Sequence, residues 1–253
     1  MRRLSTVTAA LFIAAAAHAE TLSVAVAANM MPAMEELAKG FKADAGVDLA
    51  LTPGASGKFA AQIENGAPYD AFVSADMDYP RKLFKDGFAA GEPDLYAVGT
   101  LILWTLKDLD LSKGLAVLTD PAVKAVAVAD PATAPYGKQA VAALKAAGLY
   151  DAVSRKLVYG DSLAQTNQFV TSKAADAGFV ARSLAETARW KGKGRWLEVD
   201  RKLYTPIDQG LVLLKTRSGK PRAAAVALRD YVLGKKGRAA LARYGYSLPP
   251  KTP

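Results

Sequence analysis

The chain has 253 residues, of which 51% are hydrophobic, with no Cys, one His, and 33 Lys plus Arg against 24 Asp plus Glu. The absence of Cys excludes disulfides, zinc knuckles, iron–sulfur clusters, thiolate nucleophiles and a lipid-modified N-terminal Cys. A chain of this length can form a stable core without such links, because it buries roughly 70–75% of its unfolded surface on folding.

The first 19 residues have the pattern of an export signal. Arg2 and Arg3 give a positive start, residues 4–17 are apolar, and Ala17-His18-Ala19 has the small-x-small form of a cleavage site. The apolar stretch is shorter than the ~20 residues that a membrane span needs. We therefore expect cleavage after Ala19 and a periplasmic protein with no lipid anchor. Cleavage would also remove His18, which excludes catalysis, metal binding and pH switching by His.

The net charge of +9 raises the possibility of a nucleic-acid partner, since Lys and Arg release counterions from phosphates. The basic residues are scattered, however, with local clusters at 189–195 and 235–238. Aromatic residues do not alternate with them as they do in a platform that stacks bases. We interpret the charge as a solvated surface and expect no nucleic-acid partner.

Short apolar or β-branched runs alternate with segments of helical period, which is typical of βαβ units around a parallel sheet. The first strand is predicted at 22–27. Met30, Met34, Leu37 and Phe41 then recur at helical spacing and predict a helix at 31–45. The further predicted elements are strands at 47–51, 71–73, 101–105, 126–129, 156–158, 178–181 and 210–214, and helices at 57–65, 79–86, 137–147, 162–173, 222–233 and 237–244. Since no Gly/Ser linker separates them, we expect two α/β lobes joined by short crossings.

Four junctions between a strand end and a helix start carry small or hydroxyl residues, with no charge at the turn itself. They lie at 27–30, 54–57, 134–137 and 161–163. The first turn of a helix has unpaired N–H groups and a partial positive charge, so it can bind an anion without Lys or Arg. In an open α/β sheet such junctions meet beyond the carboxyl ends of the strands. The alternative interpretation is that Asn29 and Ser56 are ordinary N-caps and that Lys58 is solvated.

These junctions belong to a set of short runs in a fixed order: Val26–Met30, Gly54–Lys58, Ala60–Asp70, Phe72–Asp76, Ala129–Pro131, Ala134–Gly137, Asp161–Gln165, Gly178–Ala181 and Tyr244–Tyr246. Their order and spacing resemble the periplasmic molybdate-binding proteins of ABC importers, over essentially the whole mature chain. The resemblance implies a bilobal fold of the periplasmic binding protein type (type II-like). Lobe 1 would comprise 20–98 and 207–253, and lobe 2 would comprise 99–206.

The resemblance also implies how the ligand is held, by uncharged donors in the cleft between the lobes. By position, the contacts would be Ala28, Asn29, Ser56, Tyr136 and Leu163. Ala28 and Leu163 could act only through their backbone N–H groups, and the Tyr136 ring would close the pocket. The implied partners are molybdate or tungstate and an ABC permease, with no cofactor, and a monomer is expected. The chain departs from the family where Ala28, Ala164 and Ala181 replace Thr, Arg and Tyr, and Asn29 stands where many members have Ser.

A pocket made only of donors suits molybdate chemically. A fully deprotonated dianion only accepts hydrogen bonds, whereas phosphate near neutral pH keeps a proton that would face a buried donor, at a cost of roughly 1–3 kcal/mol. Phosphate should therefore be rejected, and sulfate would have to be excluded by the size of the pocket. A binding protein for another small anion is the alternative.

Two other classes remain open. Asp70, Asp76 and Asp78 form a small acidic cluster that could hold a hard cation, although Asp70 borders a strand and Asp76 has the position of a helix cap. Ferric-ion capture by Tyr is less favoured, because Tyr244 and Tyr246 lie in the terminal segment. A carboxylate-based hydrolase or transferase is the last class, but the sequence has no GxSxG, P-loop or GxGxxG pattern, so we expect no enzyme.

Overall fold

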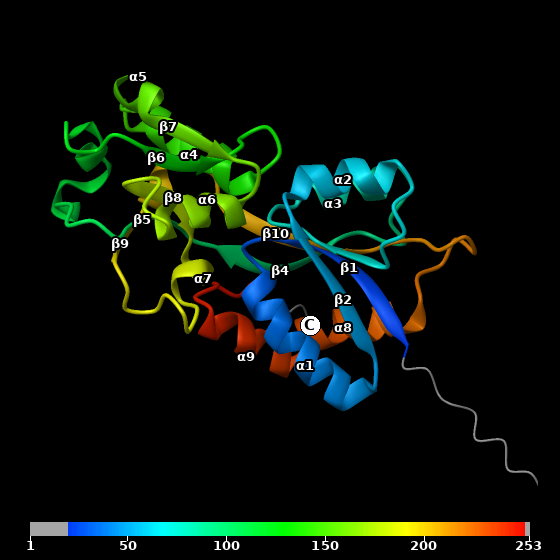
Figure 1. Ribbon diagram of the computed structural model, residues 1–253. Helices are drawn as coiled ribbons and strands as arrows, with labels where there is room; N and C mark the ends of the chain where they lie inside the picture. Colours follow the sequence, from blue (N-terminus) through cyan, green and yellow to red (C-terminus); the bar gives the residue numbers. More distant parts are fainter. Residues whose placement is uncertain (1–19, 251–253) are drawn as a thin grey trace, which may run out of the picture.

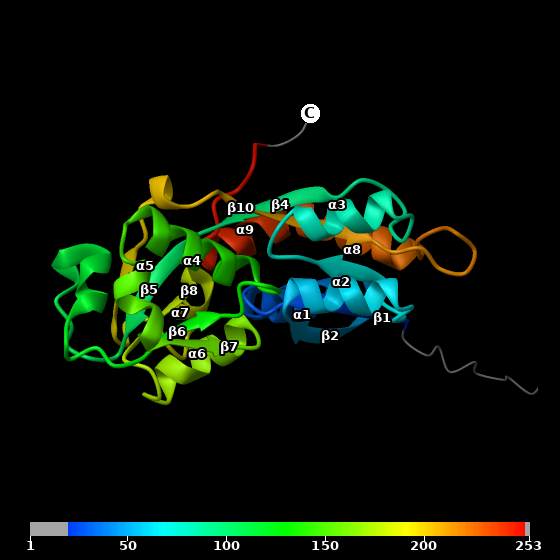
Figure 2. The same cartoon turned by 90° about the horizontal axis from the view of Figure 1, so that it is seen from above.

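The computed structural model describes residues 20–250, so the predicted signal peptide and its cleavage site lie outside the described residues. Within this range the strands form two five-stranded sheets, with the orders β2-β1-β3-β10-β4 and β7-β6-β8-β5-β9. The sheets lie side by side in two halves of the molecule, each flanked by helices (Figure 1 and Figure 2). We call the half with the first of these sheets lobe 1 and the half with the second lobe 2. The exact residue boundaries of the lobes remain a prediction.

The strands are β1 (Thr21–Ala27), β2 (Asp48–Gly54), β3 (Ala71–Val73), β4 (Asp94–Gly99), β5 (Leu101–Thr105), β6 (Val126–Ala129), β7 (Leu157–Gly160), β8 (Ala177–Ala181), β9 (Arg195–Glu198) and β10 (Ile207–Leu213). The α-helices are α1 (Met31–Ala45), α2 (Ser56–Glu64), α3 (Asp78–Lys85), α4 (Pro135–Ala146), α5 (Tyr150–Val153), α6 (Leu163–Thr171), α7 (Arg182–Ala185), α8 (Ala223–Leu233) and α9 (Lys235–Arg243). Three short 3-10 helices complete the described chain, η1 (Leu111–Thr119), η2 (Ser154–Lys156) and η3 (Arg201–Leu203).

The sheets are mixed, and the expectation of parallel sheets is wrong in this respect. Strand β10 is antiparallel to β3 and β4, and β5 is antiparallel to β8 and β9. The reason is the route of the chain. Strands β1, β3 and β6 end at the junction of the lobes, whereas β5 and β10 begin there, directly after the chain has crossed, and so run the opposite way.

Helix α1, which follows the junction at 27–30, is held in place by the apolar side chains that recur at helical spacing. Its apolar face buries Met34, Leu37 and Phe41 in the core of lobe 1 together with α8 and α9, and each such side chain contributes roughly 1.5–3 kcal/mol. Gly46 ends the helix in the left-handed conformation at φ 70°, with its N–H donating to Lys42 O.

No helix within residues 20–250 combines the length and the apolar character that crossing a membrane requires.

Candidate functional site

A small cavity lies where the ends of strands from both lobes meet the starts of four helices. About 210 Å³ of space there is not filled by protein atoms, part of it open to solvent. All five residues singled out in the sequence line it, together with Ala27, Gly54, Ala55, Ala75, Ala134 and Pro135. The four predicted junctions therefore converge on one place.

The first loop presents Asn29 rather than Ala28 as its backbone donor. The Ala28 N–H donates to Gly54 O at 3.0 Å, so the structure does not support the predicted contact of this amide with the ligand, and Ala28 lines the wall of the cavity. The Asn29 N–H has no acceptor within residues 20–250. The side-chain amide of Asn29 is used elsewhere, since its Nδ2 donates to Gln209 Oε1 at 2.8 Å and to the Tyr246 hydroxyl at 2.9 Å.

The second loop presents Ser56, which is the first residue of α2 and not its N-cap. Ser56 Oγ accepts a hydrogen bond from the Ala75 N–H at 2.9 Å, which fixes the position of the hydroxyl. Neither the Ser56 hydroxyl hydrogen nor the Ser56 N–H has an acceptor among residues 20–250. Ser56 can therefore donate two hydrogen bonds to a guest in the cavity.

In lobe 2 the cavity is bounded by the first turn of α4. Pro135 occupies a first-turn position, where its missing N–H costs nothing, and the next N–H, that of Tyr136, has no acceptor in the described chain. The Tyr136 ring is 1% exposed, and its hydroxyl accepts a hydrogen bond from Gln209 Nε2 at 3.1 Å. Burial raises the pKa of Tyr136 well above its usual range, so the hydroxyl stays neutral.

The fourth helix start belongs to α6. Ser162 is its N-cap, and its Oγ accepts from the Gln165 N–H at 3.5 Å. The N–H of Leu163, the first residue of the helix, has no acceptor among residues 20–250. Helix α6 therefore points its partially positive end and one N–H at the cavity.

Charged side chains are absent from the described lining of the cavity. Lys58, in the first turn of α2, instead forms an exposed ion pair with Asp161 across the lobes, with Nζ–Oδ2 at 3.4 Å. The attraction for an anion thus comes from backbone dipoles in a buried place. There the dipoles act more strongly than in water and need no reorganisation when the ion arrives.

Direct hydrogen bonds hold the lobes together around the cavity. The Gly57 N–H donates to Thr133 O at 2.9 Å, and Ser183 Oγ donates to Asn29 O at 2.9 Å. With Gln209 and Tyr136, these bonds join lobe 1 to lobe 2 on more than one side of the cavity. The structure is therefore a closed arrangement of the lobes.

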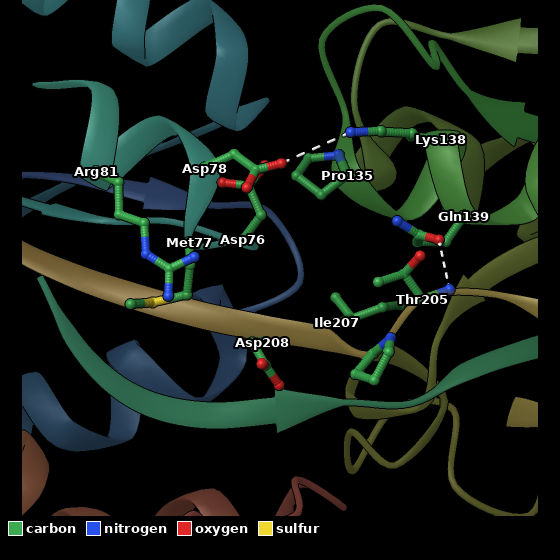
Figure 3. A pocket seen from close by; sticks show the side chains of 11 residues that line it. Asp76, Met77, Asp78, Arg81, Pro135, Lys138, Gln139, Thr205, Ile207 and Asp208 are labelled. Carbon is green, nitrogen blue, oxygen red and sulfur yellow. Dashed lines mark hydrogen bonds and ion pairs between the residues drawn. The ribbon is translucent and has the colours of Figure 1, made fainter.

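A second and larger cavity lies next to the first between the lobes, with about 650 Å³ of space (Figure 3). It contains Asp76 and Asp78, and Lys138 Nζ lies 3.6 Å from Asp78 Oδ2. Burial raises the pKa of Asp76 to about 6, against the opposing effect of the hydrogen bond that it accepts from the Tyr79 N–H.

The acidic cluster does not support a cation site. Asp70 lies apart from this cavity and pairs with Arg222 at 3.1 Å, while it accepts from the Ser23 N–H. Within residues 20–250, no group of three or more acidic or His side chains is arranged to hold a metal ion.

Sequence reasoning missed the polar residues behind the first cavity. Gln209 and Ser183 are buried, and both contact Asn29, as does the hydroxyl of Tyr246. Tyr246 belongs to a run that marked the resemblance, but Gln209 stands in an ordinary apolar strand and Ser183 in a one-turn helix. Their positions were predictable only from the fold.

Comparisons with known proteins agree with this geometry. The family model of bacterial extracellular solute-binding proteins matches residues 22–247. The molybdate-binding protein ModA of Azotobacter vinelandii is 42% identical over 238 residues, which cover 93% of each chain.

Solved structures also match. The periplasmic molybdate-binding protein of Azotobacter vinelandii has a TM-score of 0.85 at 34% identity, over 90% of this chain and 99% of that chain. The substrate-binding domain of a putative molybdenum ABC transporter from Clostridium difficile has a TM-score of 0.67 at 26% identity, over 91% of this chain and 100% of that chain. The predicted bilobal α/β fold is confirmed.

Proposed function

Because the chain belongs to the bacterial extracellular solute-binding protein family, we propose that it captures molybdate in the periplasm and delivers it to an ABC permease. The single observation that carries this proposal is the cavity without charged lining, in which helix starts from both lobes present unpaired donors. The relatives named as molybdate-binding support the choice of ion, and the match to a domain of a molybdenum ABC transporter supports the choice of partner.

The proposed contacts are backbone N–H groups of Asn29, Ser56, Tyr136 and Leu163, with the Ser56 hydroxyl as a fifth donor. Ala28 shapes the wall. Lobe 1 supplies the N–H groups of Asn29 and Ser56, and lobe 2 supplies those of Tyr136 and Leu163. The ion would therefore link the lobes and favour their closed arrangement, which is the form that a permease would recognise.

The chemistry of the donors explains the proposed selectivity. Molybdate and tungstate are fully deprotonated near neutral pH and accept hydrogen bonds on every oxygen. Phosphate retains a proton, and a donor facing that O–H would lose its partner at roughly 1–3 kcal/mol. Sulfate has the right charge but is smaller, so we expect it to fit donors that lie on two lobes less well. Tungstate, nearly the size of molybdate, should compete with it.

Isothermal titration calorimetry with the mature chain, residues 20–253, tests the proposal. Molybdate and tungstate should bind at one site and displace each other, with sulfate weaker and phosphate weaker still. The melting temperature should rise with molybdate, since a ligand at a thousandfold its dissociation constant adds about 4 kcal/mol of stability. Equal binding of phosphate, or binding of divalent cations alone, would exclude the proposed function. Size-exclusion chromatography with light scattering would test whether the protein is a monomer.

A further inference from the structure

Gln209 lies behind the cavity, on β10, close to the point where the chain returns to lobe 1. Its side chain is fully buried, and the register of β10 against β4 shifts between Gln209 and Gly210. Its Oε1 accepts from Asn29 Nδ2 at 2.8 Å and lies 2.8 Å from the Tyr96 hydroxyl, both in lobe 1. Because lobe 1 supplies donors to the oxygen, the amide must turn its NH2 group towards lobe 2, where it donates to the Tyr136 hydroxyl at 3.1 Å.

The backbone at the first crossing is adapted to this hydrogen bond. Gly99 ends β4, and a Cβ at this position would lie 2.0 Å from the Tyr136 hydroxyl and 2.4 Å from Gln209 Nε2. Any larger residue would displace one of the two partners. The Gln209–Tyr136 pair is thus packed directly against the chain that joins the lobes.

We propose that Gln209 is a positioning residue that sets the spacing between the lobes in the closed site and so selects the oxyanion by size. The inference rests on the proposed function. On the cavity side, the ion would contact the N–H groups of Asn29 and Tyr136. On the opposite side, Gln209 joins the same two residues through their side chains. The distance between donors on the two lobes is therefore fixed by the protein rather than adjusted to each ion.

A double-mutant cycle tests this role. Gln209→Leu keeps most of the volume and removes the side-chain hydrogen bonds to Asn29, Tyr96 and Tyr136. Tyr136→Phe removes only the hydroxyl and keeps the backbone N–H, and the third variant combines the two changes. Gln209→Leu should weaken molybdate binding about tenfold or more, because buried partners lose hydrogen bonds. Sulfate binding should weaken less, so that the preference for molybdate over sulfate falls. The double variant should bind molybdate about as well as Gln209→Leu alone, because each change breaks the same hydrogen bond between Gln209 and Tyr136.

Gln139→Ala is the matched control. Gln139 lies at the same junction of the lobes but faces the second cavity, where its Oε1 accepts from the Thr205 N–H at 3.1 Å (Figure 3). Its affinity and its ion preference should equal those of the wild type. Unfolding in urea without ligand separates loss of stability from loss of positioning, and Tyr136→Phe gives the answer if Gln209→Leu folds poorly.

The outcomes distinguish the two levels of the argument. A wild type that binds none of the oxyanions would reject the proposed function. A wild type that binds molybdate, combined with variants that weaken all ions equally or with additive effects in the cycle, would overturn the positioning role alone. A changed molybdate-to-sulfate ratio with non-additive effects supports it, because a merely structural residue would not alter that ratio.

Discussion

The two cavities between the lobes share Pro135 and lie side by side, yet they handle charge in opposite ways. The first has no charged lining among the described residues and presents helix N-termini. The second is lined by Asp76, Asp78, Arg81, Lys138 and Asp208. The side chains of Lys138 and Asp78 are 65% and 72% exposed, so their ion pair contributes about 0–1 kcal/mol and is screened by salt. The buried cavity can hold an ion more firmly because its dipoles are fixed and shielded from water.

The comparison of the two cavities also explains why a protein rich in Lys and Arg would bind a dianion without a Lys or Arg side chain in the site. A Lys in the first cavity would have to be desolvated before the ion arrived, which costs several kcal/mol. A helix N-terminus carries its partial charge on groups that are already part of the fold. The excess of Lys and Arg over Asp and Glu would then act at long range, on the rate at which anions arrive.

Placing a charge in the first cavity should have the largest effect. Ala134 is the N-cap of α4, with extended φ and ψ, so Ala134→Asp puts a favoured capping residue there. Its carboxylate would accept the N–H groups meant for the ion and would repel a dianion. We expect loss of molybdate affinity by roughly 3 kcal/mol or more, with an unchanged or higher melting temperature in the absence of ligand.

Ala134→Ser is the control for this change, since it caps the helix without a charge. It should keep most of the affinity measured by calorimetry. Undiminished binding by Ala134→Asp would show that the ion does not sit at the start of α4.

Removing one backbone donor should have a smaller effect. Leu163 is the first residue of α6, a position where Pro is tolerated, and Ser162 before it is extended, as Pro requires. Leu163→Pro therefore deletes one N–H while the helix remains. Because hydrogen bonds to ions contribute about 1.5–3 kcal/mol, affinity should fall by that amount. Leu163→Ala loses the same side chain but keeps the N–H, and should bind more tightly than Leu163→Pro; equal affinities would mean that this amide is not a contact.

The sequence predicted the parts of the fold that depend on local periodicity. The helix at 31–45 and the strands at 71–73, 101–105 and 126–129 have the predicted bounds. Strands β4 and β9 were missed, because their burial alternates weakly and their pairing partners are distant in sequence. The antiparallel direction of β10 follows from the crossing between lobes, which no local pattern encodes.

The sequence was enough to predict which loops line the cavity. It was not enough to predict which backbone N–H groups in those loops are unpaired. Small residues before a helix indicate that backbone N–H groups are near a cavity, and the five residues do line one. Whether Ala28 or Asn29 has the unpaired N–H depends on Gly54 O, which lies on the neighbouring strand. The role of Gln209 depends on Tyr136, 73 residues away.

The second cavity offers the complementary test, in which removing a charge changes stability and leaves the ligand unaffected. The pKa of Asp76 is raised from 3.8 to about 6, mainly by burial, with Asp78 raising it further and Lys138 opposing. The folded state thus binds this proton more tightly than the unfolded state, so stability falls as pH rises from about 4 to about 6 and is constant above. Asp76→Asn should remove this fall, which amounts to roughly 1–3 kcal/mol, and should leave molybdate affinity unchanged. Urea unfolding of the wild type and of Asp76→Asn between pH 4 and pH 8 measures the difference in the free energy of unfolding. If this free energy changed with pH in the same way in both proteins, the Asp76 carboxylate would not be destabilised by burial. The contrast between the two cavities would then depend only on how each of them binds the ion.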